Sequence, residues 1–119
     1  MTVVREAEVE AAFVRYLLEL GWDVDTDKVD HADVVARRGT EHLVAEVKGT
    51  TSSPGLDVDT AYGQLLRRMG DCPVGTRFAI VVPKSARNAA LRVPEEIRWK
   101  FDIGVWVVSE LGSVERVAD

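Results

Sequence analysis

Hydrophobic residues recur along the chain at two spacings, one typical of helices and the other of strands. Residues 3–20 follow the helical period and predict a helix, which Gly21 is expected to end as a C-cap. A second amphipathic helix is predicted over residues 58–69, with Asp57 as a candidate N-cap. A shorter helix is expected over residues 94–101, because proline suits the first helical position.

Apolar runs of strand length account for most of the remaining chain. Several are almost continuously apolar, as expected of strands covered on both faces. The predicted strands are residues 22–24, 32–36, 43–47, 77–82, 103–108 and 114–117. The resulting order is α-β-β-β-α-β-α-β-β. It predicts an α/β sandwich, in which a mixed sheet carries a helix on each face.

Two of these strands form a predicted hairpin around residues 38–41, where Gly39 can adopt the positive φ of a tight turn. A turn centred on Gly39-Thr40 places Asp33 directly opposite Glu46. Like charges in that position repel, so a cation between the two carboxylates would stabilise them. Lys48, two residues beyond Glu46, projects from the same face. Asp, Glu and Lys on one face are suited to metal-dependent hydrolysis of a phosphodiester.

The same residues also have a purely structural interpretation. A carboxylate and an ammonium group in an apolar segment are tolerated when they are paired or metal-bound, so an ion pair with Lys48 could close the end of the sheet. Glu10, near the packing face of the first helix, is either a boundary residue or a member of a buried site, and Glu6 competes for that role. Gln64, similarly placed on the second helix, could instead bond to the backbone. In the hairpin register His31 faces the Lys48 position.

Composition and charge narrow the class of protein. The 119 residues fit a single domain, residues 1–119, with a net charge of −5. Residues 1–60 carry 6 basic and 13 acidic side chains, whereas residues 67–100 carry 8 basic and 3 acidic ones. The acidic half suits a cation and the basic segment suits phosphate, although both could be solvated helix faces. The candidate nucleic-acid contacts are Arg67, Arg68, Lys84 and Arg87.

Other features exclude several classes. The lone Cys72 offers no disulfide framework and fits a reducing cytoplasm, where we expect the protein. No apolar run approaches the roughly 18 residues of a membrane span, and the acidic start is not a secretory signal. No glycine-rich phosphate loop or nucleophile elbow is present, and two histidines, His31 and His42, are too few for zinc. We therefore expect no organic cofactor and no membrane partner.

With these residues in order, the chain resembles the PD-(D/E)xK nuclease superfamily. Its motif is a helix Glu, a strand Asp and a (D/E)-x-K on the partner strand, matched here by Glu10, Asp33 and Glu46-Val47-Lys48. The additional Gln64 makes the chain most similar to Holliday-junction resolvases and related restriction-type nucleases. Ala32 replaces the family's proline. The resemblance implies a restriction-endonuclease-like α-β-β-β-α-β core, a mixed central sheet flanked by helices, here with an extra C-terminal helix and β-hairpin.

The resemblance also implies a mechanism. Asp33, Glu46 and the Val47 carbonyl would bind one or two Mg²⁺ ions, with Mn²⁺ as a substitute, and Glu10 would complete the site. Lys48 would orient the attacking water and stabilise charge on the phosphate. Gln64 would steady the phosphate or Lys48.

The first hypothesis is thus a metal-dependent endonuclease acting on DNA, with branched or structured DNA as a candidate substrate. The alternative is a catalytically silent nuclease-like domain that binds nucleic acid or a protein; a plain scaffold module is a third. Because so small a chain would cover a two-stranded substrate best as a pair, we expect a homodimer.

Overall fold

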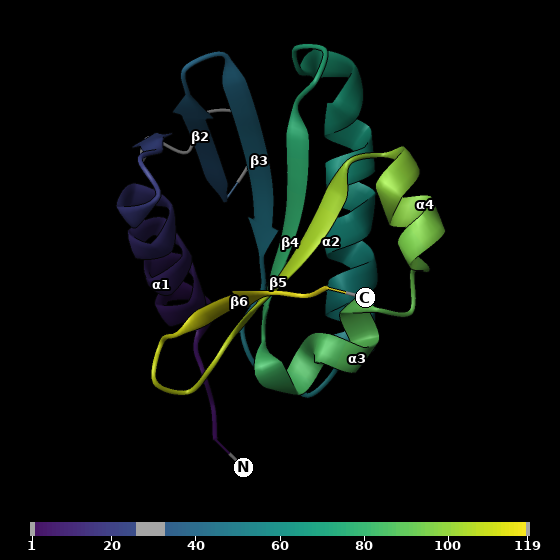
Figure 1. Ribbon diagram of the computed structural model, residues 1–119. Coiled ribbons are helices and arrows are strands. Elements are labelled where there is room, and N and C mark those ends of the chain that lie inside the picture. Colours follow the sequence, from purple (N-terminus) through teal and green to yellow (C-terminus); the bar gives the residue numbers. More distant parts are fainter. Residues whose placement is uncertain (1, 26–32, 119) are drawn as a thin grey trace.

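The computed structural model of the protein describes residues 2–25 and 33–118. Six strands form one mixed sheet in the order β1-β2-β3-β4-β5-β6 (Figure 1). The β3–β4 and β4–β5 pairs are parallel, and the other pairs are antiparallel. The strands are β1 (Asp23–Asp25), β2 (Val34–Arg38), β3 (Glu41–Val47), β4 (Arg77–Pro83), β5 (Ile103–Val108) and β6 (Val114–Arg116).

Helices connect and cover these strands. The long ones are α1 (Glu6–Glu19) and α2 (Pro54–Arg68), and α2 continues into the 3-10 turn η2 (Met69–Asp71). The β4–β5 crossover contains η3 (Lys84–Ala86), α3 (Arg87–Ala90) and α4 (Glu95–Lys100). The predicted α-β-β-β-α-β core, extra helix and C-terminal hairpin are all present. None of the helices in the described ranges is long and apolar enough to cross a membrane.

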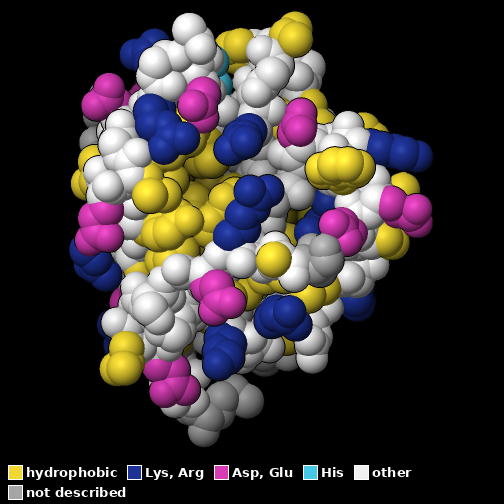
Figure 2. Space-filling view, viewed as in Figure 1, with side chains coloured by type: hydrophobic (Ala, Val, Ile, Leu, Met, Phe, Trp, Pro, Cys, Tyr) yellow, Lys and Arg dark blue, Asp and Glu magenta, His cyan; other side chains and the backbone are white. Residues whose placement is uncertain are grey.

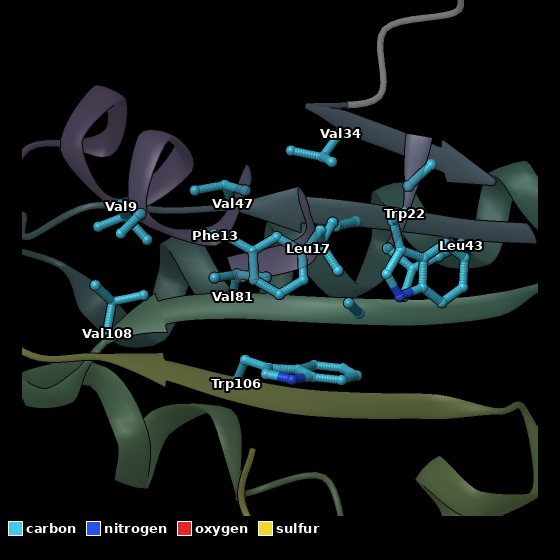
Figure 3. Close-up of a cluster of buried hydrophobic side chains, with 14 of the residues drawn as sticks. Val9, Phe13, Leu17, Trp22, Val34, Leu43, Val47, Val81, Trp106 and Val108 are labelled. Carbon is cyan, nitrogen blue, oxygen red and sulfur yellow. The ribbon is translucent and has the colours of Figure 1, made fainter. Parts of the chain in front are cut away.

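The hydrophobic core consists of two layers, one on each face of the sheet. On one face Val9, Phe13 and Leu17 of α1 pack against the strands. Figure 3 shows Phe13 among Val47, Val81 and Trp106, with Val9 and Leu17 on either side of it. On the other face α2 and α3 pack against the alternate positions of the same strands. Near-continuous apolar strands therefore result from burial on both faces, as the sequence indicated.

Helix α1 begins later than its periodicity suggested, because the residues before Glu6 bond to the segment that follows β3. The Thr50 amide donates to the Val4 carbonyl at 2.8 Å, and the Val4 amide donates to Thr50 Oγ1 at 3.0 Å. Gly49 makes this close approach possible, since a Cβ there would lie 2.3 Å from the Glu6 nitrogen. The first turn of α1 is thereby held beside the end of β3, next to Lys48.

Some local predictions were wrong. Helix α2 begins at Pro54, so Asp57 is not its N-cap but lies in its first turn, where it accepts a hydrogen bond from Thr51. Pro94 is the residue before α4 rather than its first residue. The helical segments between Lys84 and Ala90 were not predicted. Each of these errors concerns a helix end or a helix of very few turns, where the periodic signal is weakest.

Candidate functional site

The β2–β3 hairpin has the register that the sequence predicted. Gly39 in its turn has a φ of 60°, and Val34 pairs with Ala45. The next position outward therefore brings Asp33 opposite Glu46, at the end of the sheet where β3 leads into Lys48. This prediction is confirmed, and it fixes the centre of the candidate site.

Glu46 is buried on the α2 face of the sheet. Along β3, Ala45 and Val47 contribute to the core under α1, whereas Val44 contributes to the core under α2. Glu46 shares the α2 face with Val44, because strand side chains alternate. Only 2% of its surface is exposed. Its neighbour on β4 is the fully buried Ile80. The carboxylate thus stands in an otherwise apolar layer, where an unpaired charge is costly.

Asp33 reaches across to β3 and is held there by the backbone. Its Oδ2 accepts a hydrogen bond from the Val47 amide at 2.8 Å, and the side chain is half-buried. Burial, the Asp33 charge and a side-chain hydrogen bond with Asp33 raise the pKa of Glu46 from 4.5 to about 7. The ionised form of Glu46 is therefore disfavoured beside Asp33 unless a cation is added.

Two cations of the protein also lie close to Glu46. Arg68, near the end of α2, places its Nε 3.2 Å from Glu46 Oε1, and 18% of the Arg68 side chain is exposed. Lys48 is half-buried, and its charge lowers the pKa of Glu46, as does that of Arg68. The Lys48 amide continues the β3–β4 ladder by donating to the Val81 carbonyl at 3.0 Å. Arg68 was expected to contact nucleic acid, and its pairing with Glu46 was not predicted.

The two candidate acids of α1 differ in their exposure. Glu10 on α1 is half-buried and Glu6 is exposed, so Glu10 fits an inward role better. Within residues 2–25 and 33–118, however, no group of three or more His, Cys, Asp or Glu side chains is placed to hold a metal. The participation of Glu10 therefore stays a prediction. His31 lies outside the described residues.

A hollow of about 660 Å³ opens beside Arg68 on the α2 face. Val35 and Val44 of the hairpin line it, together with Gln64 and Arg67 of α2. Gln64 Oε1 is buried and has no hydrogen-bond partner in the described part of the chain. Arg68 therefore lies between Glu46 and a hollow of mixed polar and apolar lining, which is large enough for a small part of a substrate.

The basic residues proposed to contact nucleic acid are spread over two segments. Arg67 is exposed at the rim of the hollow. Lys84 and Arg87 are exposed just after β4. Because β3 and β4 are parallel, their carboxyl ends lie at the same end of the sheet. On the side of the molecule seen in Figure 2, Lys and Arg side chains alternate with Asp and Glu. That side carries mixed charge rather than a uniformly basic surface.

The donor set fits a hard divalent cation. Two carboxylates, one of them almost fully buried, converge at one point, and oxygen ligands are what Mg²⁺ prefers. The raised pKa of Glu46 indicates that the protein's own cations leave this pair incompletely compensated. A metal ion at this point would favour the ionised form of Glu46.

Comparisons with known proteins bear on the fold. The chain is similar to the crystal structure of an XisH family protein from Nostoc punctiforme, with a TM-score of 0.67 and 18% sequence identity. The alignment covers 93% of this chain and 99% of that one. The architecture is that of a restriction-endonuclease-like α/β fold, as the sequence predicted. No protein-family model matches the chain, and no curated protein matches it. Because similarity of fold alone does not establish an activity, the function has to be argued from the site.

Proposed function

We propose that this protein is a metal-dependent endonuclease of the PD-(D/E)xK type, which hydrolyses phosphodiester bonds of DNA. One observation carries the proposal: Asp33 and a buried Glu46 lie opposite each other as an acid pair, with Lys48 at the end of the same strand as Glu46. That arrangement sits at the carboxyl end of β3 in a nuclease-like fold.

Each residue has a distinct role in this proposal. Asp33 and Glu46 hold Mg²⁺, with the Val47 carbonyl as a further oxygen ligand and Glu10 approaching from α1. When bound, the ion supplies an activated water and neutralises charge on the phosphate. The backbone bond from the Val47 amide fixes one Asp33 oxygen and leaves the other for the site. Lys48 places a positive charge where the phosphate oxygens gain charge.

The substrate would lie across the acid pair and the adjoining hollow. Arg67 at the rim of the hollow and Lys84 and Arg87 beyond β4 would bind backbone phosphates, which position the polymer without reading its sequence. Gln64 would steady the phosphate nearest the metal. The net charge of −5 makes association dependent on these local basic groups rather than on overall attraction.

The test is cleavage of labelled duplex, single-stranded and branched DNA with Mg²⁺, Mn²⁺ or EDTA. Wild type is compared with Glu46→Gln and Lys48→Met, and with Glu41→Gln as the matched control. Glu41 lies on the same strand but is exposed and pairs with Arg38. Loss of a metal ligand or of Lys48 should lower the rate about 100-fold or more, and the control should not change it. Cleavage that survives both substitutions, or that persists in EDTA, would refute the proposal.

One observation favours the silent binding domain as a second candidate. Glu46 already has an ion-pair partner in Arg68, and no third acid joins the pair in a metal-holding group within the described ranges. Such a domain would bind DNA in gel-shift assays equally well in EDTA and in Mg²⁺, without cleaving it. Metal-dependent cleavage would exclude this candidate.

A further inference from the structure

Arg68 is the charged group that connects the acid pair to the hollow. Its Nε lies 3.2 Å from Glu46 Oε1, while the residue also lines the hollow beside Gln64 and Arg67. Arg68 therefore neutralises part of the carboxylate that a metal ion would need. A cation from solution and the Arg68 guanidinium would compete for the same oxygen of Glu46.

The structure offers Arg68 a second position. Gln64 precedes it by one helical turn, so the two side chains are neighbours on α2. Gln64 Oε1 is buried and has no hydrogen-bond partner in the described part of the chain, a costly state for an amide oxygen. A guanidinium group can donate five hydrogen bonds, and the hollow of about 660 Å³ leaves room for it to turn. Leaving Glu46 would therefore let Arg68 satisfy this acceptor.

We propose, on the basis of the metal-dependent function above, that Arg68 is a placeholder for the metal. Without metal, it occupies Glu46 and stabilises the acid pair. When a divalent cation binds Asp33 and Glu46, Arg68 turns into the hollow, bonds to Gln64 and presents its remaining donors to a substrate phosphate. The same side chain thus stabilises the empty site and becomes a phosphate contact only once the site is loaded. Arginine suits both tasks, because it pairs well with carboxylates and phosphates alike.

Metal binding measured without DNA tests this proposal. Isothermal titration with Mg²⁺ and Mn²⁺ would compare wild type, Arg68→Met and Arg68→Lys. Methionine keeps an unbranched stem in the hollow and removes the charge, whereas lysine keeps the charge and loses the guanidinium. Arg67→Met is the matched control, since it removes one positive charge from the next residue on the same helix end, where the side chain is exposed. Circular dichroism establishes that each variant is folded.

Removing a competitor should tighten metal binding. We expect Arg68→Met to bind metal roughly threefold to fivefold more tightly than wild type, because the metal no longer has to displace Arg68 from Glu46. Arg68→Lys should fall between the two, and Arg67→Met should match wild type. If Arg68→Met binds metal no more tightly than wild type, or if Arg67→Met tightens binding to the same extent, the placeholder role is wrong.

The outcomes separate this proposal from the function on which it rests. If the folded wild type binds no metal, the metal-dependent function fails and the placeholder role fails with it. If wild type binds metal and cleaves DNA but Arg68→Met shows unchanged affinity, only the placeholder role is refuted. A Gln64→Leu variant adds a second measurement, because loss of the alternative acceptor should weaken metal binding in the presence of Arg68 and have no effect in Arg68→Met.

Discussion

Replacing Glu46 by glutamine should make the metal-free protein more stable at neutral and alkaline pH. Burial and the neighbouring Asp33 raise the pKa of Glu46 from 4.5 to about 7. An acid with a raised pKa favours folding while it is protonated. Its contribution therefore becomes unfavourable as pH rises above 4.5, where the unfolded chain ionises freely, and levels off above 7, where the folded protein ionises too. Glutamine resembles the protonated acid at every pH.

The pKa difference sets the size of the effect. Moving a carboxyl pKa from 4.5 to about 7 corresponds to about 3 kcal/mol once both states are ionised. Most of this develops in the titration range, so the advantage of Glu46→Gln should grow by about 2.5 kcal/mol between about pH 5 and pH 8. In a domain of this size that is an additional rise of about 10 °C in the melting temperature.

Thermal unfolding followed by circular dichroism in EDTA measures the effect. The melting temperatures of wild type, Glu46→Gln and the control Glu41→Gln would be measured across that pH range. The pH dependence contributed by titratable groups common to all three proteins then cancels in the differences. The melting temperature of the control should vary with pH in the same way as that of wild type, because Glu41 is exposed at the other end of β3. A Glu46→Gln difference that does not change with pH, or that falls as pH rises, would refute this account of the buried Glu46 carboxyl group.

Three further predictions concern the metal, the scaffold and the assembly. Mg²⁺ at about 100 times its dissociation constant should stabilise wild type by about 2.7 kcal/mol relative to EDTA, measured as a rise in melting temperature. If wild type shows no rise, or if Glu46→Gln shows an equally large one, Glu46 is not part of a metal site. Gly49→Ala should destabilise the protein by about 3 kcal/mol in chemical denaturation, since the added Cβ would lie 2.3 Å from the Glu6 nitrogen. Gly70→Ala is the control, because a Cβ at that position would have no neighbouring atom within 4 Å in the described part of the chain. Sedimentation should give about twice the chain mass of 13.1 kDa, and a single-chain mass at working concentration would rule out the homodimer.

Much of the fold was predictable because its signals are local and periodic. The apolar runs gave strands buried on both faces, and Gly39 fixed the hairpin register that brings Asp33 opposite Glu46. Shorter elements carried too little periodicity: α3 has only four residues and was not predicted. Many residues along two strands indicate the same hairpin register, whereas a four-residue helix has too few residues to show a periodic pattern.

The site was predictable to the extent that it depends on the backbone. Strand alternation put Glu46 and Lys48 on one face, and helix periodicity placed Gln64 toward the sheet. The Arg68–Glu46 pair could not be predicted in the same way, because it joins residues 22 positions apart through the rotamer of a long side chain. A usable signal did exist: Arg68 follows Gln64 by one helical turn, so any argument that points Gln64 inward points Arg68 inward as well.

The energetic balance at Glu46 argues against a purely structural role for that residue. It occupies a position between apolar neighbours, where a valine would gain burial energy without charge. The ionised carboxylate instead costs about 3 kcal/mol at neutral pH, and this net cost already includes the favourable charges of Arg68 and Lys48. The uncompensated remainder is a sizeable share of the 5–15 kcal/mol that holds a typical domain together. Such a deficit at a pair of converging acids is characteristic of functional sites, and a divalent cation is the ligand whose binding would remove it.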